Sequence, residues 1–217
     1  MENIKIVIPA RRNSKGLPFK NRILFYQTVN KIPKKYLEHV IVSSDDEVII
    51  EECANTGITC DVRKPELAED TTSTKAVLVD LLDRGLITEE HTVIMLYLTY
   101  PERTWKDVKK AFDWFQNHRT YSLLCKKEIK GTHPYLYMFE SGEHWGEQLV
   151  HHDLYRRQDY PKVFEISHFI CIFKAKALKF LNNNLYYHHT FFYPINDVVD
   201  VDTESDLKQI NDEDITH

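Results

Sequence analysis

Short apolar runs alternate with segments of helical periodicity along the first half of the chain. The runs with the length of a buried strand are residues 4–8, 39–43, 59–62 and 92–98. The segments between them with the periodicity of a helix are residues 23–31, 44–55 and 74–83. Strands that alternate with helices in this way form a mostly parallel sheet with helices on both faces. The pattern therefore predicts one α/β domain that spans residues 1–217.

The second half of the chain carries similar but fewer signals. Its predicted strands are residues 121–125 and 167–173, and its predicted helices follow Thr104 and occupy residues 174–181. The pairs with the spacing of a capping box are Ser44 with Glu47, Thr104 with Asp107, and Thr203 with Asp206. In this motif two side chains form hydrogen bonds to free backbone groups at the start of a helix. Each pair therefore predicts that a helix begins there. Gly57 is expected to end the helix that follows Ser44.

The composition is that of an ordinary soluble protein. Of its 217 residues 42% are hydrophobic and 28% are charged, and the net charge is −5. The acidic balance argues against a general nucleic-acid-binding protein, because nucleic acids are polyanions. No apolar run reaches the roughly 18 residues of a membrane span, and the start of the sequence lacks the pattern of a signal peptide. We therefore expect a cytoplasmic protein with no nucleic-acid or membrane partner.

A basic loop follows the first predicted strand, which is expected to end at Pro9 because proline has no N–H to donate. The cations of this loop are Arg11, Arg12, Lys15 and Lys20. Ligands of open α/β sheets bind at the carboxyl ends of strands, and cations with backbone N–H groups suit a polyphosphate. The alternative is a solvated basic loop. Neither GxGxxG nor GxxxxGK with Ser or Thr is present, so a nucleotide would be held in another way.

Two aspartates stand near the end of the chain, with one residue between them. On an extended segment, Asp200 and Asp202 face one way, and Val199 and Val201 face the other. Neighbouring carboxylates repel each other unless a cation lies between them or one is protonated. Mg²⁺ suits the pair, because it binds one or two carboxylates together with substrate phosphates. The alternative is a solvated turn before the last helix, where acidic residues are common.

The basic loop, IPARRNSKGLPFKN, resembles the first motif of the CMP-sialic acid synthetases, or N-acylneuraminate cytidylyltransferases, whose A-R-x-x-S-K-G-x-x-x-K-N pattern wraps CTP. RKPELAEDTTS, from Arg63, resembles the family's R-P-x-x-L-A-x-D-x-x-S, although Pro65 lies one place later than usual. DVDTESD, from Asp200, matches its D-x-D-T-x-x-D. The resemblance implies a three-layer Rossmann-like nucleotidyltransferase fold. It also implies a homodimer, through a small dimerisation excursion at about residues 140–165.

The resemblance assigns roles on the nucleotide side. The residues implied to bind the nucleotide are Arg11, Arg12, Asn13, Ser14, Lys15, Lys20, Asn21, Arg63 and Ser73. The residues implied to be catalytic are Lys15, Asp200 and Asp202, and the two aspartates are implied to hold Mg²⁺ as the cofactor. For Arg63, residue chemistry alone leaves open a surface ion pair with Glu66 or Asp70, since exposed pairs are common and weak.

The resemblance extends less completely to the sugar side. The residues implied to bind the substrate are Tyr97, Thr99, Arg157, Gln158 and His168. Arg157 lies in RRQDYP, which resembles the family's R-Q-x-x-P, and would hold the sugar carboxylate by a bidentate contact. The chain departs from the family at two places. Tyr97 replaces a glutamine, and Ser167, His168 and Phe169 replace the sequence N-G-A.

The resemblance implies a cytidylyltransferase that uses CTP and Mg²⁺ to activate an acidic sugar, sialic acid or a related nonulosonic acid. The products would be a CMP-sugar and pyrophosphate. One alternative is CMP transfer to a different acceptor, because the matches are best on the nucleotide side. A second is a non-catalytic CTP-binding protein of the same fold. The enzyme hypothesis requires that the basic loop and the two aspartates converge in space on one anion.

Overall fold

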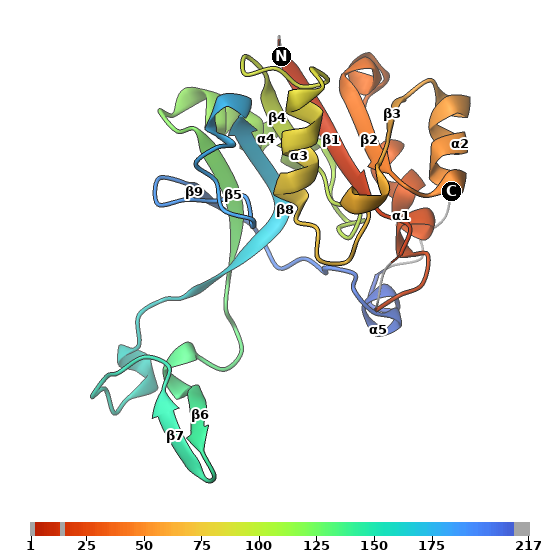
Figure 1. Ribbon diagram of the computed structural model, residues 1–217. Helices are drawn as coiled ribbons and strands as arrows, with labels where there is room; N and C mark the ends of the chain where they lie inside the picture. Colours follow the sequence, from red (N-terminus) through yellow and green to blue (C-terminus); the bar gives the residue numbers. More distant parts are fainter. Residues whose placement is uncertain (1–2, 14–15, 211–217) are drawn as a thin grey trace.

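Seven strands form one central sheet in the computed structural model, which describes residues 3–13 and 16–210 (Figure 1). Their order across the sheet is β3-β2-β1-β4-β8-β5-β9. The strands are β1 (Ile4–Ala10), β2 (Val40–Ser44), β3 (Thr59–Val62), β4 (Thr92–Met95), β5 (Ser122–Glu128), β8 (Phe164–Lys174) and β9 (Phe191–Pro194). β8 runs antiparallel to β4 and β5, and the other neighbours pair in parallel. The sheet is therefore mostly parallel, as predicted.

Helices cover both faces of this sheet. They are α1 (Lys20–Val29), α2 (Glu47–Thr56), α3 (Thr74–Asp83), α4 (Trp105–Asn117) and the short α5 (Glu204–Leu207). Ile6 and Ile8 of β1 belong to one buried cluster with α1, α2 and α4, whereas Val7 belongs to a second cluster with α3. Successive residues of a strand point to opposite faces, so the clusters lie on the two sides of the sheet and give three layers. None of the helices in the described part of the chain is long and apolar enough to cross a bilayer.

Several predicted boundaries are confirmed. β3 occupies residues 59–62 and α3 occupies residues 74–83, as the apolar pattern indicates. Gly57 ends α2 with a φ of 69°, a left-handed conformation that glycine adopts without steric cost. Thr104 and Thr203 each begin a helix with a complete capping box. In these segments the local signal and the tertiary packing favour the same boundary.

The predicted end of β1 is wrong. Pro9 does not stop the strand, which runs to Ala10 and pairs Pro9 with Ser43 of β2. The pairing of β1 with β4 ends at Val7, so beyond that residue only one side of β1 has a partner strand. A proline is tolerated where its missing N–H faces no neighbouring strand.

The predicted start of α2 is also wrong. Ser44 does not cap the helix, despite its spacing to Glu47. It belongs to β2, and its hydroxyl donates to the carbonyl of Ala10 at 2.6 Å. Asp46 caps α2 instead, by accepting a hydrogen bond from the N–H of Val48 at 3.0 Å. The Ser44 side chain, which was expected to cap the helix, is therefore hydrogen-bonded to the neighbouring strand β1 instead.

Three further segments differ from the prediction. α1 begins three residues early, at Lys20, and β4 ends three residues early, at Met95. Residues 174–181 do not form an α-helix. β8 instead continues to Lys174, and a 3₁₀ turn at Ala175–Ala177 follows. Antiparallel pairing with β4 and β5 outweighs the weak helical preference of this segment.

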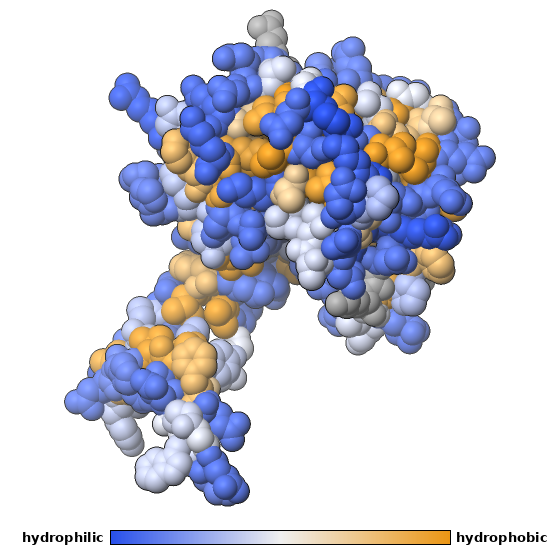
Figure 2. Space-filling view, viewed as in Figure 1, coloured by the Kyte–Doolittle hydropathy of each residue, from blue (hydrophilic) through white to orange (hydrophobic). Residues whose placement is uncertain are grey.

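An arm of residues 129–163 leaves the sheet between β5 and β8 (Figure 1). It contains the hairpin strands β6 (Met138–Gly142) and β7 (Trp145–Gln148), and 3₁₀ helices at Pro134–Leu136 and Arg157–Asp159. Every residue of the two hairpin strands is exposed, and Figure 2 shows apolar side chains on the surface of the arm. The arm covers most of the segment predicted as an excursion and begins earlier than expected, and its part in dimerisation stays a prediction. Neither face of the hairpin is buried, so its sequence shows no strand periodicity.

Candidate functional site

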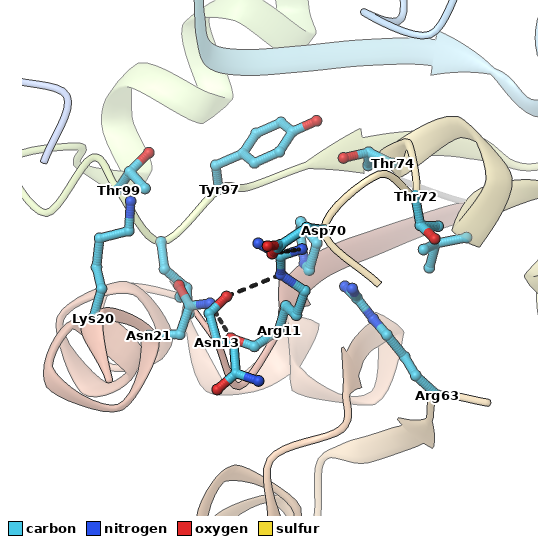
Figure 3. A pocket seen from close by; sticks show the side chains of 13 residues that line it. Arg11, Asn13, Lys20, Asn21, Arg63, Asp70, Thr72, Thr74, Tyr97 and Thr99 are labelled. Carbon is cyan, nitrogen blue, oxygen red and sulfur yellow. Dashed lines mark hydrogen bonds and ion pairs between the residues drawn. The ribbon is translucent and has the colours of Figure 1, made fainter. Parts of the chain in front are cut away.

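A cleft of about 270 Å³ opens at the carboxyl ends of β1 and β4 (Figure 3). The residues that line it are Pro9, Arg11, Asn13, Lys20, Asn21, Arg63, Asp70, Thr72, Thr74, Val77, Tyr97, Leu98 and Thr99. β1 lies between β2 and β4, so the strand order reverses there: the chain continues from β1 to β2 and β3 on one side and returns to β4 on the other. Open α/β sheets bind ligands at such a reversal. The topology therefore places a ligand in this cleft.

Arg11 connects the basic loop to the loop that precedes α3. Its Nη1 lies 2.8 Å from Asp70 Oδ1 and donates to the carbonyl of Glu69 at 3.0 Å. Its Nε donates to the carbonyl of Asn13 at 2.9 Å. The carbonyl of Arg11 accepts a hydrogen bond from Asn21 Nδ2 at 2.7 Å, which ties the loop to α1. These contacts hold the Arg11 side chain in the wall of the cleft (Figure 3).

Arg63 supplies a second guanidinium to the cleft. It follows β3, and its Nε donates to the hydroxyl of Ser43 at 3.0 Å. Burial lowers the pKa of Arg63, and the charges of Asp45 and Asp61 offset part of this effect. The positive charge of Arg11 also lowers the pKa of Arg63. Two like charges beside one partly buried cleft destabilise each other and favour the binding of an anion.

Lys20 connects the start of α1 with the acidic segment that precedes α5. It is buried at the start of α1, and its Nζ lies 2.6 Å from Asp202 Oδ1, 182 positions later in the sequence. The backbones also approach closely, because a Cβ atom placed on Gly16 would lie 2.3 Å from the carbonyl oxygen of Asp202. Only glycine fits such an approach. The basic loop and the acidic segment therefore converge, as the enzyme hypothesis requires.

The two aspartates lie on the extended segment before α5. Val201 between them is buried, and its N–H donates to the carbonyl of Thr99 at 2.8 Å. Asp200 and Asp202 are exposed, so the alternation of faces is the predicted one. The hydroxyl of Tyr100 donates to Asp200 Oδ2 at 2.7 Å. The consecutive residues Thr99 and Tyr100 thus hold this segment through one backbone bond and one side-chain bond.

The carboxylates of Asp200 and Asp202 fit a divalent cation of the Mg²⁺ type. They share one face of the segment, and Tyr100 and Lys20 each hold one of them. Carboxylate oxygens are the protein ligands that Mg²⁺ prefers. No group of three or more His, Cys, Asp or Glu side chains within the described ranges could hold a metal ion. A cation at the two aspartates would therefore take its other ligands from water and substrate phosphates, as Mg²⁺ commonly does.

The two positions that depart from the sugar-side family pattern are in contact with each other. Tyr97 lines the cleft together with Thr99. The ring of His168 packs edge-to-face on Tyr97 with a centroid distance of 5.5 Å, and its Nε2 donates to the carbonyl of Asn184 at 3.1 Å. Burial raises the pKa of Tyr97, so its hydroxyl stays neutral. In place of the family's glutamine, this cleft is therefore lined by the aromatic ring of Tyr97, against which His168 packs.

Two of the nucleotide-side residues have other contacts. Ser73 caps α3, and its hydroxyl oxygen accepts a hydrogen bond from the N–H of Ala76 at 3.2 Å. Arg12 donates its backbone N–H to Asp45 Oδ1 at 2.8 Å. Neither residue is among those that line the cleft.

Two predicted substrate residues lie in the arm. Arg157 and Gln158 form part of its second 3₁₀ helix, and both are exposed. Figure 1 shows the arm projecting away from the sheet, and neither residue is among those that line the cleft. The chain therefore does not bring these residues to its own cleft. Ser14 and Lys15, predicted for the nucleotide, lie outside the described residues.

Among the residues of the site that sequence reasoning missed, three carry hydroxyl groups. Thr72 and Thr74 line the cleft beside the start of α3, and Tyr100 holds Asp200. The hydroxyl groups on either side of the helix cap were an available signal for the two threonines. No local sequence signal pointed to Tyr100, because its partner Asp200 lies 100 positions later in the sequence.

A family model described as cytidylyltransferase matches residues 5–215. The chain belongs to the cytidylyltransferase family. An N-acylneuraminate cytidylyltransferase of Streptococcus agalactiae is 28% identical over 213 residues, 93% of this chain and 51% of the relative. A pseudaminic acid cytidylyltransferase of Campylobacter jejuni is 29% identical over 223 residues, 96% of this chain and 94% of the relative. The chain thus spans about half the length of the streptococcal relative.

Solved nucleotidyltransferase structures share the fold. CMP:2-keto-3-deoxy-manno-octonic acid synthetase in complex with CTP gives a TM-score of 0.65 at 13% identity, with 96% of both chains covered. The 4-diphosphocytidyl-2C-methyl-D-erythritol synthase of Anaerococcus prevotii gives 0.61 at 12% identity, with 97% of both chains covered. At such identities the likeness concerns the fold alone. The predicted Rossmann-like nucleotidyltransferase fold and the resemblance to cytidylyltransferases are confirmed.

Proposed function

We propose that this protein is an enzyme that transfers CMP from CTP to an acidic sugar, with release of pyrophosphate. The contact between Lys20 and Asp202 carries the proposal, because Lys20 lines the cleft and the acidic segment is bonded to it. A triphosphate in this cleft would lie against the cations of the loop on one flank and the aspartates on the other. The names of the Streptococcus and Campylobacter relatives support the reaction class. We place the protein in the cytoplasm, as the composition suggests.

On the nucleotide side, Arg11 and Arg63 face the cleft with positive charge, and Asn21 fixes the Arg11 backbone. We assign these residues, Lys20 and the loop residue Lys15 to binding and orienting the triphosphate. Asp200 and Asp202 would hold Mg²⁺. When bound, this ion neutralises phosphate charge and stabilises the leaving pyrophosphate.

The chemistry is a substitution at the α-phosphorus of CTP. The anomeric hydroxyl of the sugar attacks that atom, a new P–O bond forms, and the bond to the β-phosphate oxygen breaks. The hydroxyl proton passes to solvent, and pyrophosphate leaves. The residues of the cleft contribute by holding both reactants in line and by placing cations where charge develops on the leaving group. Electrostatic positioning of this kind supplies most of the catalysis in phosphoryl-type transfers.

On the acceptor side, Tyr97 and Thr99 would contact the sugar, with His168 supporting Tyr97. The relatives' names give N-acylneuraminate and pseudaminic acid as their sugars, and both are acidic. An aromatic wall recognises apolar parts of a sugar better than an amide does. The Tyr97–His168 contact therefore favours a nonulosonic acid other than N-acetylneuraminate as the preferred acceptor.

The arm supports a homodimer. Met138, Phe139 and Trp145 expose large apolar surfaces on it, and such surfaces on a soluble protein commonly mark protein–protein contacts. Arg157 and Gln158 are not among the residues that line the cleft of their own chain. We therefore assign them to the cleft of the second subunit, where Arg157 would bind the sugar carboxylate through two parallel hydrogen bonds.

A pyrophosphate-release assay tests the proposal. The protein is incubated with CTP and Mg²⁺, with N-acetylneuraminate in one arm and pseudaminic acid in another. We expect turnover that needs both CTP and an acidic sugar, and faster turnover with pseudaminic acid. Preference for N-acetylneuraminate would contradict the altered acceptor. Measurable CTP binding without turnover on any acidic sugar would identify a non-catalytic CTP-binding protein instead.

A further inference from the structure

Tyr100 lies between the sheet and the proposed metal ligands. It is 4% exposed, and its ring packs edge-to-face on Phe169 of β8 with a centroid distance of 5.6 Å. Its hydroxyl lies 2.7 Å from Asp200 Oδ2 and 3.5 Å from Ser167 Oγ. We propose that Tyr100 is a positioning residue that fixes the carboxylate of Asp200 for metal binding. This inference rests on the proposed function.

The geometry of the bond supports this role. Asp200 is exposed, so its carboxylate would rotate freely without a partner. The Tyr100 ring is fixed by packing on Phe169, and its hydroxyl is a hydrogen-bond donor to Asp200. An ionised carboxylate has about four acceptor positions, so one hydrogen bond leaves the remaining oxygen positions for a cation. Partners of this kind orient metal ligands before the ion arrives.

The two aspartates differ in the charge of their partners. Lys20 is a cation, and at 2.6 Å it neutralises Asp202 and competes with a metal ion for it. The hydroxyl of Tyr100 is neutral, so it orients Asp200 without cancelling its negative charge. Within the described part of the chain no cation pairs with Asp200, so this ordered carboxylate keeps its negative charge and is the first ligand for an incoming cation.

Removing the hydroxyl should leave the backbone of the segment in place. Val201 between the aspartates is buried, and its N–H is bonded to the carbonyl of Thr99 at 2.8 Å. A Tyr100→Phe variant keeps the buried ring and its contact with Phe169. The substitution therefore tests the orientation of one carboxylate and leaves the path of the chain unchanged.

The experiment measures the binding of Mn²⁺, used as a paramagnetic probe for Mg²⁺, by electron paramagnetic resonance of the free ion. We expect Tyr100→Phe to weaken Mn²⁺ binding about tenfold or more, the usual effect of losing a partner of a metal ligand. The Mg²⁺ concentration for half-maximal turnover should rise, and kcat at saturating Mg²⁺ should largely recover. The matched control is Tyr26→Phe, which removes a hydroxyl bonded to Glu52 between α1 and α2. It should leave Mn²⁺ binding unchanged.

Asp200→Asn and Asp202→Asn separate this inference from the function on which it rests. If both aspartate variants and Tyr100→Phe weaken Mn²⁺ binding, the positioning role is supported. If the aspartate variants weaken it and Tyr100→Phe only lowers the Tm, Tyr100 is structural and the inference fails alone. If neither aspartate variant changes Mn²⁺ binding, the assignment of the metal ligands is wrong, and the positioning role of Tyr100 is wrong as well.

Discussion

At the scale of single residues, the site depends on charges that are only partly compensated. The side chain of Lys20 is 9% exposed and that of its partner Asp202 is 69% exposed. An ammonium group with so little exposure needs a partner, because an unpaired charge away from water is costly. Arg11 and Arg63 add two guanidinium groups to the same cleft. The cleft is thus locally cationic in a chain whose net charge is −5.

Asp202→Asn tests the acidic flank of the cleft. The amide oxygen can still accept a hydrogen bond from Lys20, so we expect the Tm to change by no more than a few degrees. Loss of the negative charge should lower kcat by about 100-fold or more, because metal binding and phosphate charge balance both use it. Steady-state pyrophosphate release and thermal unfolding measure the two effects. Normal turnover in this variant would contradict the assignment of Asp202.

Arg63→Gln tests the basic flank. Loss of a charge-assisted contact with phosphate is expected to weaken CTP binding by about tenfold or more. Isothermal titration with CTP alone measures this without any acceptor. Arg119→Gln, an exposed position just after α4, is the matched control for the loss of one positive charge. Equal weakening in both variants would mean that Arg63 acts only through the overall charge.

At the scale of elements, the loop after β1 and the segment before α5 must touch for the proposed site to contain both its cations and its aspartates. Gly16 permits this contact, because any Cβ atom there would overlap the carbonyl oxygen of Asp202. Val201 fixes the segment on its other side through its bond to Thr99. The contact is therefore set by backbone positions as well as by charges.

Gly16→Ala should separate the loop from the acidic segment. A displacement of about 1 Å in a catalytic site can lower the rate about 100-fold, and we expect a loss of kcat/KM of this order. The matched control is Gly131→Ala in the arm, where nothing lies within 4 Å of the added Cβ atom. Kinetics and thermal unfolding of both variants test this, and equal activities would contradict the close approach.

The capping box of α5 predicts a dependence on pH. Hydrogen bonds from the hydroxyl and N–H of Thr203 and from the N–H of Asp202 lower the pKa of Asp206. A carboxyl whose pKa is lower in the folded state stabilises the fold above its unfolded pKa, about 3.9, and loses this effect as the pH falls through the folded value. Wild type should therefore exceed Asp206→Asn in Tm near pH 7. The difference should shrink below about pH 4, and a constant difference would contradict the cap's role.

At the scale of the whole molecule, the sequence predicts the sheet and both flanks of the cleft, because these rest on local patterns. Strand length, helix caps and the alternation around Val201 each depend on a few neighbouring residues. Other features depend on distant contacts. The length of β8 is set by its antiparallel partners, and the role of Tyr100 by a residue 100 positions away. The hairpin of the arm has no buried face, so no pattern marks it.

The proposed dimer predicts complementation between two inactive variants. If the arm supplies Arg157 to the partner's cleft, a mixed dimer of Arg157→Ala and Asp202→Asn contains one intact site. After subunit exchange, about a quarter of the sites should be intact, because half of the dimers are mixed and each has one such site. Activity of the mixture, against each variant alone, measures this. No recovery, despite exchange shown by mass spectrometry, would place Arg157 in its own subunit or outside the site.

The contact between Lys20 and Asp202 can form only after residue 202 has been synthesised. The ribosome adds about 5–20 residues per second, so about 10–40 s pass between the translation of these two residues. During that interval the nascent chain carries its cationic loop without the acidic counterpart. A product that stops before residue 200 lacks both aspartates even if its first strands have folded. On the proposed function, we therefore expect such chains to have no CTP turnover.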